Sequence, residues 1–491
     1  MPRAEGVKQK ASWIGVIRSP GASRGETVLP INHRLIIRHP SKPEILLVND
    51  AGRLRLPAFV SDDRHTAEVD YINLAVQERF GLRTTVLRSL HHSDPLADVV
   101  VRIHELEAHG DGAPLPSGAR WCGLDGSPPG ADGEDADVIA EWLAAAAASR
   151  GAVDGREWTL PGWFEEVCGW LEQALADAGV REVREIVQLR AWTSSCVLLV
   201  RTGAGTFYFK TVSESGRHEC TVTGYLAQHF PETVARIVAT KPERRWFVMT
   251  ALEGGKLEDV GDVMLWERAA AVYGQLQRAC MERVRDLHAL GCPTRGLDTL
   301  AAEIEPLSAD VTALRTGEPD GLSAAEVDRL RAYGPELRRR CERLAACGIP
   351  LTLEHGDLWP GNVLVDDATC AIIDWEDVAI GHPFISLAPL IVGLGMFQPR
   401  LSSPEVMQRL ERAYLAPFAG LAPPERLLEA LRLAGPLSFV DMAVRYRGQR
   451  PSVVRLHPWM RDLVPHTLRL ALAQLDIEEE TRPTPPRRAG R

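Results

Sequence analysis

The 491-residue sequence predicts an α+β fold, with a small α+β domain, a β-rich lobe and a helical lobe in that order. Short β-rich runs bounded by Pro, Gly and Ser occupy the first half of the chain. From residue 258 onward, apolar residues recur at helical spacing. One loop and one predicted hairpin, between residues 353 and 376, concentrate the polar side chains of a candidate site. A chain of this length exceeds a single hydrophobic core, so several domains are expected.

Composition favours a cytoplasmic globular protein, with 45% hydrophobic and 25% charged residues. The net charge of −10 argues against a nucleic-acid partner. The nine cysteines are scattered without metal-site spacing, which favours reduced thiols. No apolar segment follows the basic residues near the N-terminus, so no signal peptide is expected. The longest apolar run, 384–396, is shorter than the ~20 residues that cross a bilayer, so we expect no membrane partner. Oligomeric state has no signal in the sequence.

Residues 1–130 are expected to form the small α+β domain. Two β-rich runs, 33–38 and 44–48, predict a hairpin, and 98–106 predicts a further strand. Between them, 67–80 has one apolar stripe at helical spacing, and Gly81 is a natural C-cap. Residues 131–155 are rich in Gly, Pro, Asp and Ala and are predicted to be a linker, although an Ala-rich run there also allows a helix.

The N-terminal domain resembles a Nudix domain, because strands and a loop precede a helix that ends in E-x-x-G-L. Glu78 and Gly81 keep that pattern. Ala75 and Arg79 occupy positions where the family has metal-binding carboxylates, and the loop 56–59 lacks the usual Gly-Gly. The resemblance therefore implies a Nudix-like domain that is inactive in hydrolysis and serves in packing or in sensing a ligand.

Residues 156–257 are predicted to form the β-rich lobe with a leading amphipathic helix over 161–178. Strands are expected at 183–192, 196–201 and 206–212, with a tight Gly turn between the last two. A further apolar strand, 245–252, leaves the lobe.

Lys210 lies inside the third of these strands, as does the lysine that contacts nucleotide phosphates in kinases. Glu219 begins the next helical run and is its expected carboxylate partner, ahead of Glu214 in the preceding loop. The Ser194-Ser195 turn lies where kinases carry a phosphate-binding loop, and hydroxyls with backbone N–H groups can serve there. The backbone from Thr250 to Leu252 suits a hinge that hydrogen-bonds an adenine edge; an ordinary strand end is the alternative.

Residues 258–475 are predicted to be the helical lobe. Apolar periodicity predicts helices at 265–290, 324–346, 404–416, 424–433, 437–445 and 465–475. Residues 476–491 are charged and Pro-rich and are expected to be a disordered tail.

The candidate site lies in the sequence His355-Gly-Asp-Leu-Trp-Pro-Gly-Asn362 and the hairpin that follows it. Asp357 and Asn362 keep a D-x4-N spacing, in which the first residue meets a hydroxyl and the second holds a metal. The hairpin, with strands at 362–365 and 371–374, returns Asp374 beside Asn362. Oxygen donors without Cys or His suit Mg²⁺. His355 is expected to orient the loop rather than act as a base.

Residues 156–475 resemble the aminoglycoside phosphotransferase and choline kinase family, through His355 to Asn362, Ile373-Asp-Trp-Glu376 and Gly381-His-Pro-Phe384. The resemblance implies a protein-kinase-like two-lobe fold, ATP, Mg²⁺ and transfer of the γ-phosphoryl group to a small-molecule hydroxyl. It assigns Asp357 as base, Asn362 and Asp374 as metal ligands, and Lys210 with Glu219 to the phosphates. The family has an Asp shortly after G-x-P that braces the catalytic loop; here that position is Ser386.

Two further hypotheses compete with this phosphotransferase. One is a nucleotide- or metabolite-binding regulator with weak catalysis, suggested by Ser386 and the lost Nudix carboxylates. The other is a Nudix-type hydrolase, against which residues 74–82 argue. The acceptor is expected to bind to the helical lobe, where acidic residues such as Asp377 and Asp441 either meet an amine or serve as solvated or capping residues.

Overall fold

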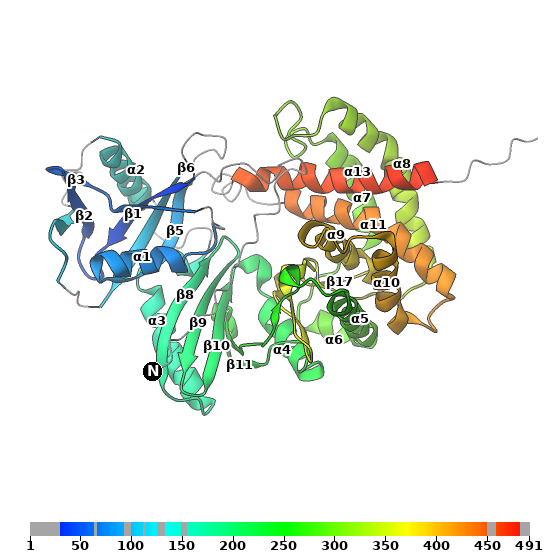
Figure 1. Cartoon of the computed structure of the whole chain (residues 1–491), viewed down its shortest axis with the longest axis horizontal. Coiled ribbons are helices and arrows are strands. Elements are labelled where there is room, and N and C mark those ends of the chain that lie inside the picture. Colours follow the sequence, from blue (N-terminus) through cyan, green and yellow to red (C-terminus); the bar gives the residue numbers. More distant parts are fainter. Residues whose placement is uncertain are drawn as a thin grey trace, which may run out of the picture. The chain divides into compact units, whose positions relative to one another are not determined.

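The computed structural model describes residues 30–62, 66–92, 100–110, 114–124, 133–148, 155–448 and 458–481. The chain forms two compact units (Figure 1). The first holds the residues up to Cys220 together with 236–251, and the second holds 221–235 and most of the chain from Leu252 onward. The first unit is rich in strands and the second in helices, so the α+β expectation is confirmed.

The first unit begins with a seven-stranded mixed sheet, in which β1 runs parallel to β6 and the other pairs are antiparallel. Its strands are β1 (Ile31–Arg38), β2 (Glu44–Asp50), β3 (Arg53–Arg55), β4 (Ala58–Ser61), β5 (Arg83–His92), β6 (Val100–His109) and β7 (Ala119–Gly123). Two helices, α1 (Asp70–Phe80) and α2 (Glu134–Ala148), cover opposite faces of this sheet. Successive side chains of β1 point to opposite faces of the sheet. Leu35 and Ile37 therefore pack with α1, whereas Ile36 packs with α2.

Helix α2 lies in the segment that composition assigned to a linker over 131–155. Ile139 and Trp142 are buried against the sheet. Asp135 accepts a hydrogen bond from the backbone N–H of Leu56 at 3.2 Å and pairs with Arg34 at 3.3 Å. Residues 134–148 therefore belong to the N-terminal domain. The helix that the Ala-rich run allowed is present, and its apolar residues pack against the sheet.

The second sheet of this unit has five antiparallel strands in the order β11-β12-β10-β9-β8. They are β8 (Val183–Ala191), β9 (Ser195–Thr202), β10 (Gly205–Val212), β11 (Ile237–Lys241) and β12 (Trp246–Thr250), preceded by the short 3-10 turn η1 (Glu157–Thr159) and by α3 (Trp163–Asp177). Helix α3 buries Trp163, Val167 and Leu171 against Phe209 and Trp246 of the sheet. Helix α4 (Glu219–His229) follows β10 through a short loop. The predicted strands and both helices are confirmed; β11 was not predicted.

The second unit is built from helices around one apolar core. They are α5 (Val263–Cys280), α6 (Val284–Ala289), α7 (Leu297–Ala309), α8 (Ala324–Ala346), α9 (Leu387–Phe397), α10 (Pro404–Leu415), α11 (Pro424–Arg447) and α13 (Leu463–Thr481). Two small sheets complete it: β13 (Gly255–Lys256) with β15 (Val363–Val365) and β16 (Cys370–Ile372), and β14 (Thr352–Glu354) with β17 (Ala379–Gly381).

Helix boundaries in this unit depart from the predictions in three places. The predicted helix 265–290 is two helices, separated by a 3-10 turn at Met281–Arg283. The two predicted helices at 424–433 and 437–445 are one, α11, which continues through Pro436. Proline cannot donate to the carbonyl of residue 432, and the Arg340 guanidinium supplies a donor to that oxygen at 3.5 Å instead. Helix α13 extends to Thr481, into the predicted tail, whose remainder lies outside the described residues.

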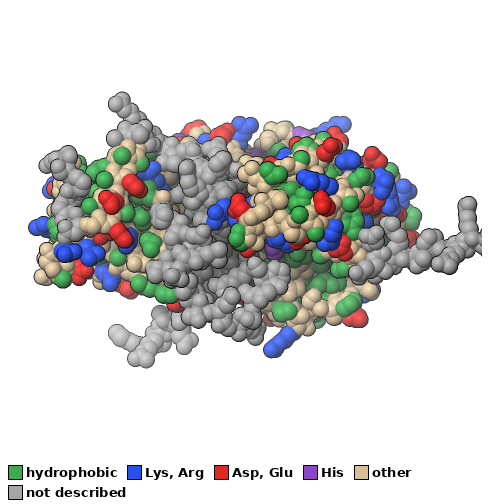
Figure 2. Space-filling view, turned by 90° about the horizontal axis from the view of Figure 1, so that it is seen from above, with side chains coloured by type: hydrophobic (Ala, Val, Ile, Leu, Met, Phe, Trp, Pro, Cys, Tyr) green, Lys and Arg blue, Asp and Glu red, His purple; other side chains and the backbone are tan. Residues whose placement is uncertain are grey.

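Charged side chains of both signs are interspersed over the described part of the face that Figure 2 draws. Ion pairs also form on α8, where Arg339 pairs with Glu336 at 2.9 Å and Arg343 pairs with Glu429 at 2.6 Å. None of the helices in the described residues is both long enough and apolar enough to cross a membrane.

Candidate active site

The candidate site is built on a loop and a hairpin of the second unit. Strand β14 is fully buried and leads directly into His355-Gly-Asp357. A 3-10 turn, Pro360–Asn362, then starts β15, which pairs with β16 so that Val363 lies opposite Ile372. The backbone N–H of Ile373 donates to the Asn362 carbonyl at 3.0 Å. The hairpin therefore places Asp374 next to Asn362 at its open end, as the sequence predicted.

His355 holds the loop through both ring nitrogens. Its Nδ1 accepts the backbone N–H of Asp357 at 3.2 Å, and its Nε2 lies 3.0 Å from the Ile373 carbonyl oxygen. Because Nδ1 accepts, Nε2 carries the proton and donates it to that carbonyl. The ring is buried and packs against Trp375 at 4.6 Å between centroids. A ring engaged on both sides orients the loop and is not placed to take a proton from a substrate.

Asp357 and Asn362 are joined by two hydrogen bonds. Asn362 Nδ2 donates to the Asp357 carbonyl oxygen at 2.8 Å and to its Oδ2 at 3.2 Å. Burial raises the pKa of Asp357 to about 7, with the charge of Asp377 adding to the rise and that of Arg445 opposing it. A carboxylate whose pKa lies near neutrality is suited to accept a proton at neutral pH.

The oxygen atom of the Asn362 side chain fits a metal ligand. Asn362 Nδ2 donates both of its hydrogen bonds to Asp357. These bonds fix the orientation of the amide, so that Oδ1 points away from Asp357. Asn362 is 1% exposed, and its Oδ1 has no hydrogen-bond partner among the described residues. Beside it, Asp374 has a left-handed backbone (φ 67°), a conformation that Asp adopts more readily than most non-glycine residues. A buried amide oxygen and a carboxylate are ligands that Mg²⁺ prefers.

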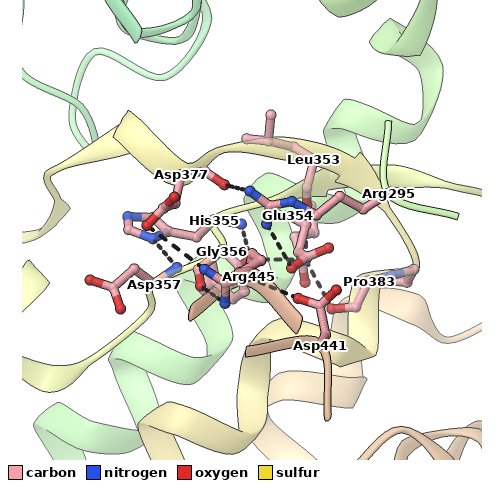
Figure 3. A network of polar contacts seen from close by, with 12 residues as sticks. Arg295, Leu353, Glu354, His355, Gly356, Asp357, Asp377, Pro383, Asp441 and Arg445 are labelled. Carbon is pink, nitrogen blue, oxygen red and sulfur yellow. Dashed lines mark hydrogen bonds and ion pairs between the residues drawn. The ribbon is translucent and has the colours of Figure 1, made fainter. Parts of the chain in front are cut away.

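Two arginines and three acidic residues surround the base of the loop (Figure 3). Arg445, from α11, donates to the Gly356 carbonyl at 2.6 Å and to Asp441 Oδ2 at 3.0 Å. Arg295 donates to the Asp377 carbonyl at 2.6 Å and lies 3.6 Å from Glu354 Oε1. The sequence analysis missed both arginines, because neither lies near the loop in sequence nor belongs to a motif. It also left Asp377 and Asp441 open as amine ligands; in the structure both face Arg445, at 3.7 and 3.0 Å.

Ser386 lies in a 3-10 turn, Pro383–Ser386, and is 3% exposed. It is a neighbour of Tyr273, whose hydroxyl accepts the backbone N–H of His355 at 2.9 Å. Gln277 fixes this region further by donating to the carbonyls of Leu353 and Pro383 at 2.9 and 3.0 Å. The loop is thus held by Tyr273, Gln277 and Arg445, and a carboxylate at position 386 is not needed to explain its conformation.

In the first unit, Lys210 and Glu219 form the predicted pair, with Nζ 2.7 Å from Oε1. Both are buried, at 5% and 2% exposure. The turn before β9 is closed by the Trp192 N–H, which donates to the Ser195 carbonyl at 2.8 Å, while the Ser194 carbonyl accepts from Ser213 at 2.6 Å.

The predicted hinge lies where the two units divide. Thr250 ends β12, and its backbone N–H donates to the Arg236 carbonyl oxygen at 3.0 Å. One of the places where the chain passes from the first unit to the second lies between Ala251 and Leu252.

A strand-rich lobe with a buried Lys–Glu pair, followed by a helical lobe with an H-G-D-x4-N loop, defines a phosphotransferase of protein-kinase-like fold. Residues 185–427 match the model of the phosphotransferase enzyme family. The match indicates a phosphotransferase. The match does not include residues 31–123, so the Nudix resemblance stays a prediction.

Solved structures of phosphotransferases are similar to this chain at low identity. Ethanolamine kinase from Plasmodium vivax is 13% identical, with a TM-score of 0.42 over 58% of this chain and 82% of its own. Choline kinase from Cryptosporidium parvum is 13% identical, with a TM-score of 0.45 over 60% and 90%. Aminoglycoside phosphotransferase from Streptomyces rimosus is 19% identical, with a TM-score of 0.37 over 56% and 98%. No curated protein matches the chain.

Proposed function

We propose that the protein transfers the γ-phosphoryl group of ATP, in the presence of Mg²⁺, to a hydroxyl group of a small molecule. The observation that carries this proposal is the Asp357–Asn362 pair. One side chain offers a proton acceptor, and the other holds a buried oxygen that has no hydrogen-bond partner among the described residues.

Asp357 acts as the proton acceptor in this proposal. Its Oδ2 is occupied by Asn362, so Oδ1 is the oxygen that meets the acceptor hydroxyl. In Figure 3 the Asp357 carboxylate points away from the cluster of arginines and acids, which supports its proposed contact with a substrate. The loop backbone is held by His355 and Tyr273, which keeps the carboxylate in place without movement of the loop.

Asn362 and Asp374 are the residues that would hold Mg²⁺. When bound there, the ion supplies charge neutralisation at the phosphates, which phosphoryl transfer requires. In the first unit, Lys210 is proposed to contact the phosphates, with Glu219 fixing its ammonium group. The Ser194-Ser195 turn is proposed to approach the phosphates and the backbone from Thr250 to Leu252 to bind the adenine edge.

The acceptor oxygen forms a bond to the γ-phosphorus while the bond from that phosphorus to the β–γ bridging oxygen breaks. ADP leaves with that electron pair, and the hydroxyl proton passes to Asp357. The loop supplies position and charge, which are the main sources of catalysis in phosphoryl transfer.

The proposal is tested by incubating the protein with ATP, Mg²⁺ and a library of hydroxyl compounds, and reading phosphate transfer by mass spectrometry. Asp357→Asn is expected to lower the turnover of any acceptor found by at least about 10²-fold, because general-base assistance alone contributes about that much. Asp367→Asn is the matched control, since Asp367 is an exposed carboxylate on the same hairpin.

Equal turnover in the wild type and Asp357→Asn would contradict the role given to Asp357. Binding of ATP without transfer to any acceptor, in both proteins, would favour the regulatory alternative. Cleavage of a nucleoside diphosphate that survives Asp357→Asn and is lost in Glu78→Gln would instead indicate a hydrolase in the N-terminal domain.

A further inference from the structure

The backbone of the catalytic loop is closely packed at Gly356. Its φ of +81° is a conformation that only glycine adopts without strain. A Cβ at this position would overlap the carbonyl oxygen of Asp377. The carbonyl of Gly356 therefore has one fixed direction, and the residue that meets it is the Arg445 guanidinium, at 2.6 Å.

Arg445 is itself held on three sides. Its Nε donates to Asp441 Oδ2 at 3.0 Å, one helical turn earlier on α11. Its Nη1 lies 3.7 Å from Asp377 Oδ2, and its Nη2 donates to Gly356. The side chain is 16% exposed and that of Asp441 is 12% exposed, so both charges are largely removed from water. Burial works to lower the pKa of Arg445, but Asp441 and Asp377 outweigh it and keep the group charged.

Arg445 also balances the negative charge around the loop. Glu354, Asp377 and Asp441 all lie in this region with Asp357 (Figure 3). Arg295 contacts Glu354 and the Asp377 carbonyl. The Gly356 carbonyl and Asp441 are contacted by Arg445. Among the described residues, Arg445 is the cation that joins α11 to the backbone immediately before Asp357.

We propose that Arg445 is the positioning residue for Asp357: its guanidinium ties the Gly356 carbonyl to Asp441 and so fixes the direction of the catalytic carboxylate. This inference rests on the proposed function for its effect on turnover, but its effect on the loop is independent of activity. Neither Arg445 nor Asp441 is assigned contact with ATP, Mg²⁺ or the acceptor, so the contribution falls on the chemical step.

The kinetic test compares four variants with the wild type, using the acceptor found by the screen. Arg445→Met is expected to lower kcat by about 10- to 100-fold, because a hydrogen bond to a charged group is lost. The KM for ATP is expected to stay within about threefold. Arg445→Lys is expected to remain well below the wild type, since one ammonium group cannot meet both Gly356 and Asp441 in this geometry. Arg447→Met is the matched control, because Arg447 lies two residues further on α11 and pairs with Glu303.

The double variant Arg445→Met/Asp441→Asn separates positioning from stability. Arg445→Met alone leaves the buried Asp441 carboxylate without its cation, which destabilises the fold. Replacing Asp441 with Asn removes that charge and is expected to restore the melting temperature without restoring kcat. Recovery of kcat together with stability would overturn the proposal, as would wild-type kcat in Arg445→Lys or an equal loss in Arg447→Met.

Hydrogen exchange gives a readout that needs no turnover. In the double variant, amides of the peptide 353–359 are expected to exchange about tenfold faster than in the wild type, while α8 is unchanged. Unchanged exchange in 353–359 would overturn the positioning role. If the wild type transfers phosphate to no acceptor and the exchange still accelerates, the proposed function fails and the role of Arg445 in holding the loop stands.

Discussion

Lys210 and Glu219 form a buried ion pair on which the stability of the fold is expected to depend. Their 2.7 Å ion pair is buried at 5% and 2% exposure, on adjacent elements β10 and α4. Taking one partner away leaves a buried charge without its counter-ion, which costs more than the loss of the pair as a whole. The pair therefore has a structural consequence that is separate from the proposed contact with phosphates.

Lys210→Met is expected to lower the free energy of unfolding by about 3–5 kcal/mol, because Glu219 stays buried without its cation. The double variant Lys210→Met/Glu219→Met is expected to regain most of that stability and still to lack transferase activity. Denaturant unfolding measures the first effect and the acceptor assay the second. Arg201→Met is the control on the same sheet, since its exposed ion pair with Glu185 contributes only about 0–1 kcal/mol. A Lys210→Met protein as stable as this control would contradict the expectation.

At the scale of elements, the edge strand β8 is covered by the N-terminal domain. The Val69 N–H donates to the Leu189 carbonyl at 3.0 Å, and the Ala191 N–H donates to the Ala67 carbonyl at 2.9 Å. The buried side chain of Gln188 bonds both backbone groups of Val86, at 2.7 and 2.9 Å. Covering an edge strand removes a site for unwanted pairing, so the two sheets of this unit depend on each other.

Gln188→Leu is expected to destabilise this unit by about 2–4 kcal/mol, because the N–H and C=O of Val86 lose their partners while remaining buried. Gln173→Leu on α3 is the control, because its contact with Asp177 lies at the surface. Urea unfolding followed by tryptophan fluorescence measures both. A change smaller than about 0.5 kcal/mol in Gln188→Leu would mean that the two sheets are held together by other contacts.

At the scale of the whole molecule, buried histidines connect stability to pH. His382 is 3% exposed, and its Nδ1 accepts the backbone N–H of Phe384 at 3.3 Å. Burial lowers the pKa of His382 to about 3, whereas an unfolded histidine titrates near 6.5. Because the folded pKa is the lower one, the stabilisation is complete above about pH 6.5 and is lost progressively as the pH falls toward 3.

Between pH 7 and pH 5, His382 is expected to account for about 2 kcal/mol of lost stability in the helical unit. His382→Gln removes the titration and can keep an acceptor for Phe384, so its unfolding free energy is expected to fall less steeply with acid. Chemical unfolding at a series of pH values gives both slopes. Equal slopes in the two proteins would show that His382 is not held neutral by the fold.

Much of the architecture follows from local pattern. The strands β8, β9 and β10, helices α8 and α10, and the hairpin after Asn362 were predicted because their periodicity and turn residues are local. Of the site, the same holds for Asp357, Asn362 and Asp374, which lie within one short segment, and for Lys210 and Glu219, nine residues apart.

Packing decided what local pattern could not. The contact between Arg445 and Gly356 spans 89 residues, and that between Gln188 and Val86 spans 102. Helix α11 continues through Pro436, and the carbonyl that the proline leaves without a donor is met by Arg340, 92 residues away. Nothing near Arg445, Gln188 or Arg340 in the sequence distinguishes it from other polar residues on a helix or strand. Each gains its role only when the folded chain brings a distant backbone group to it, in a place from which water is excluded.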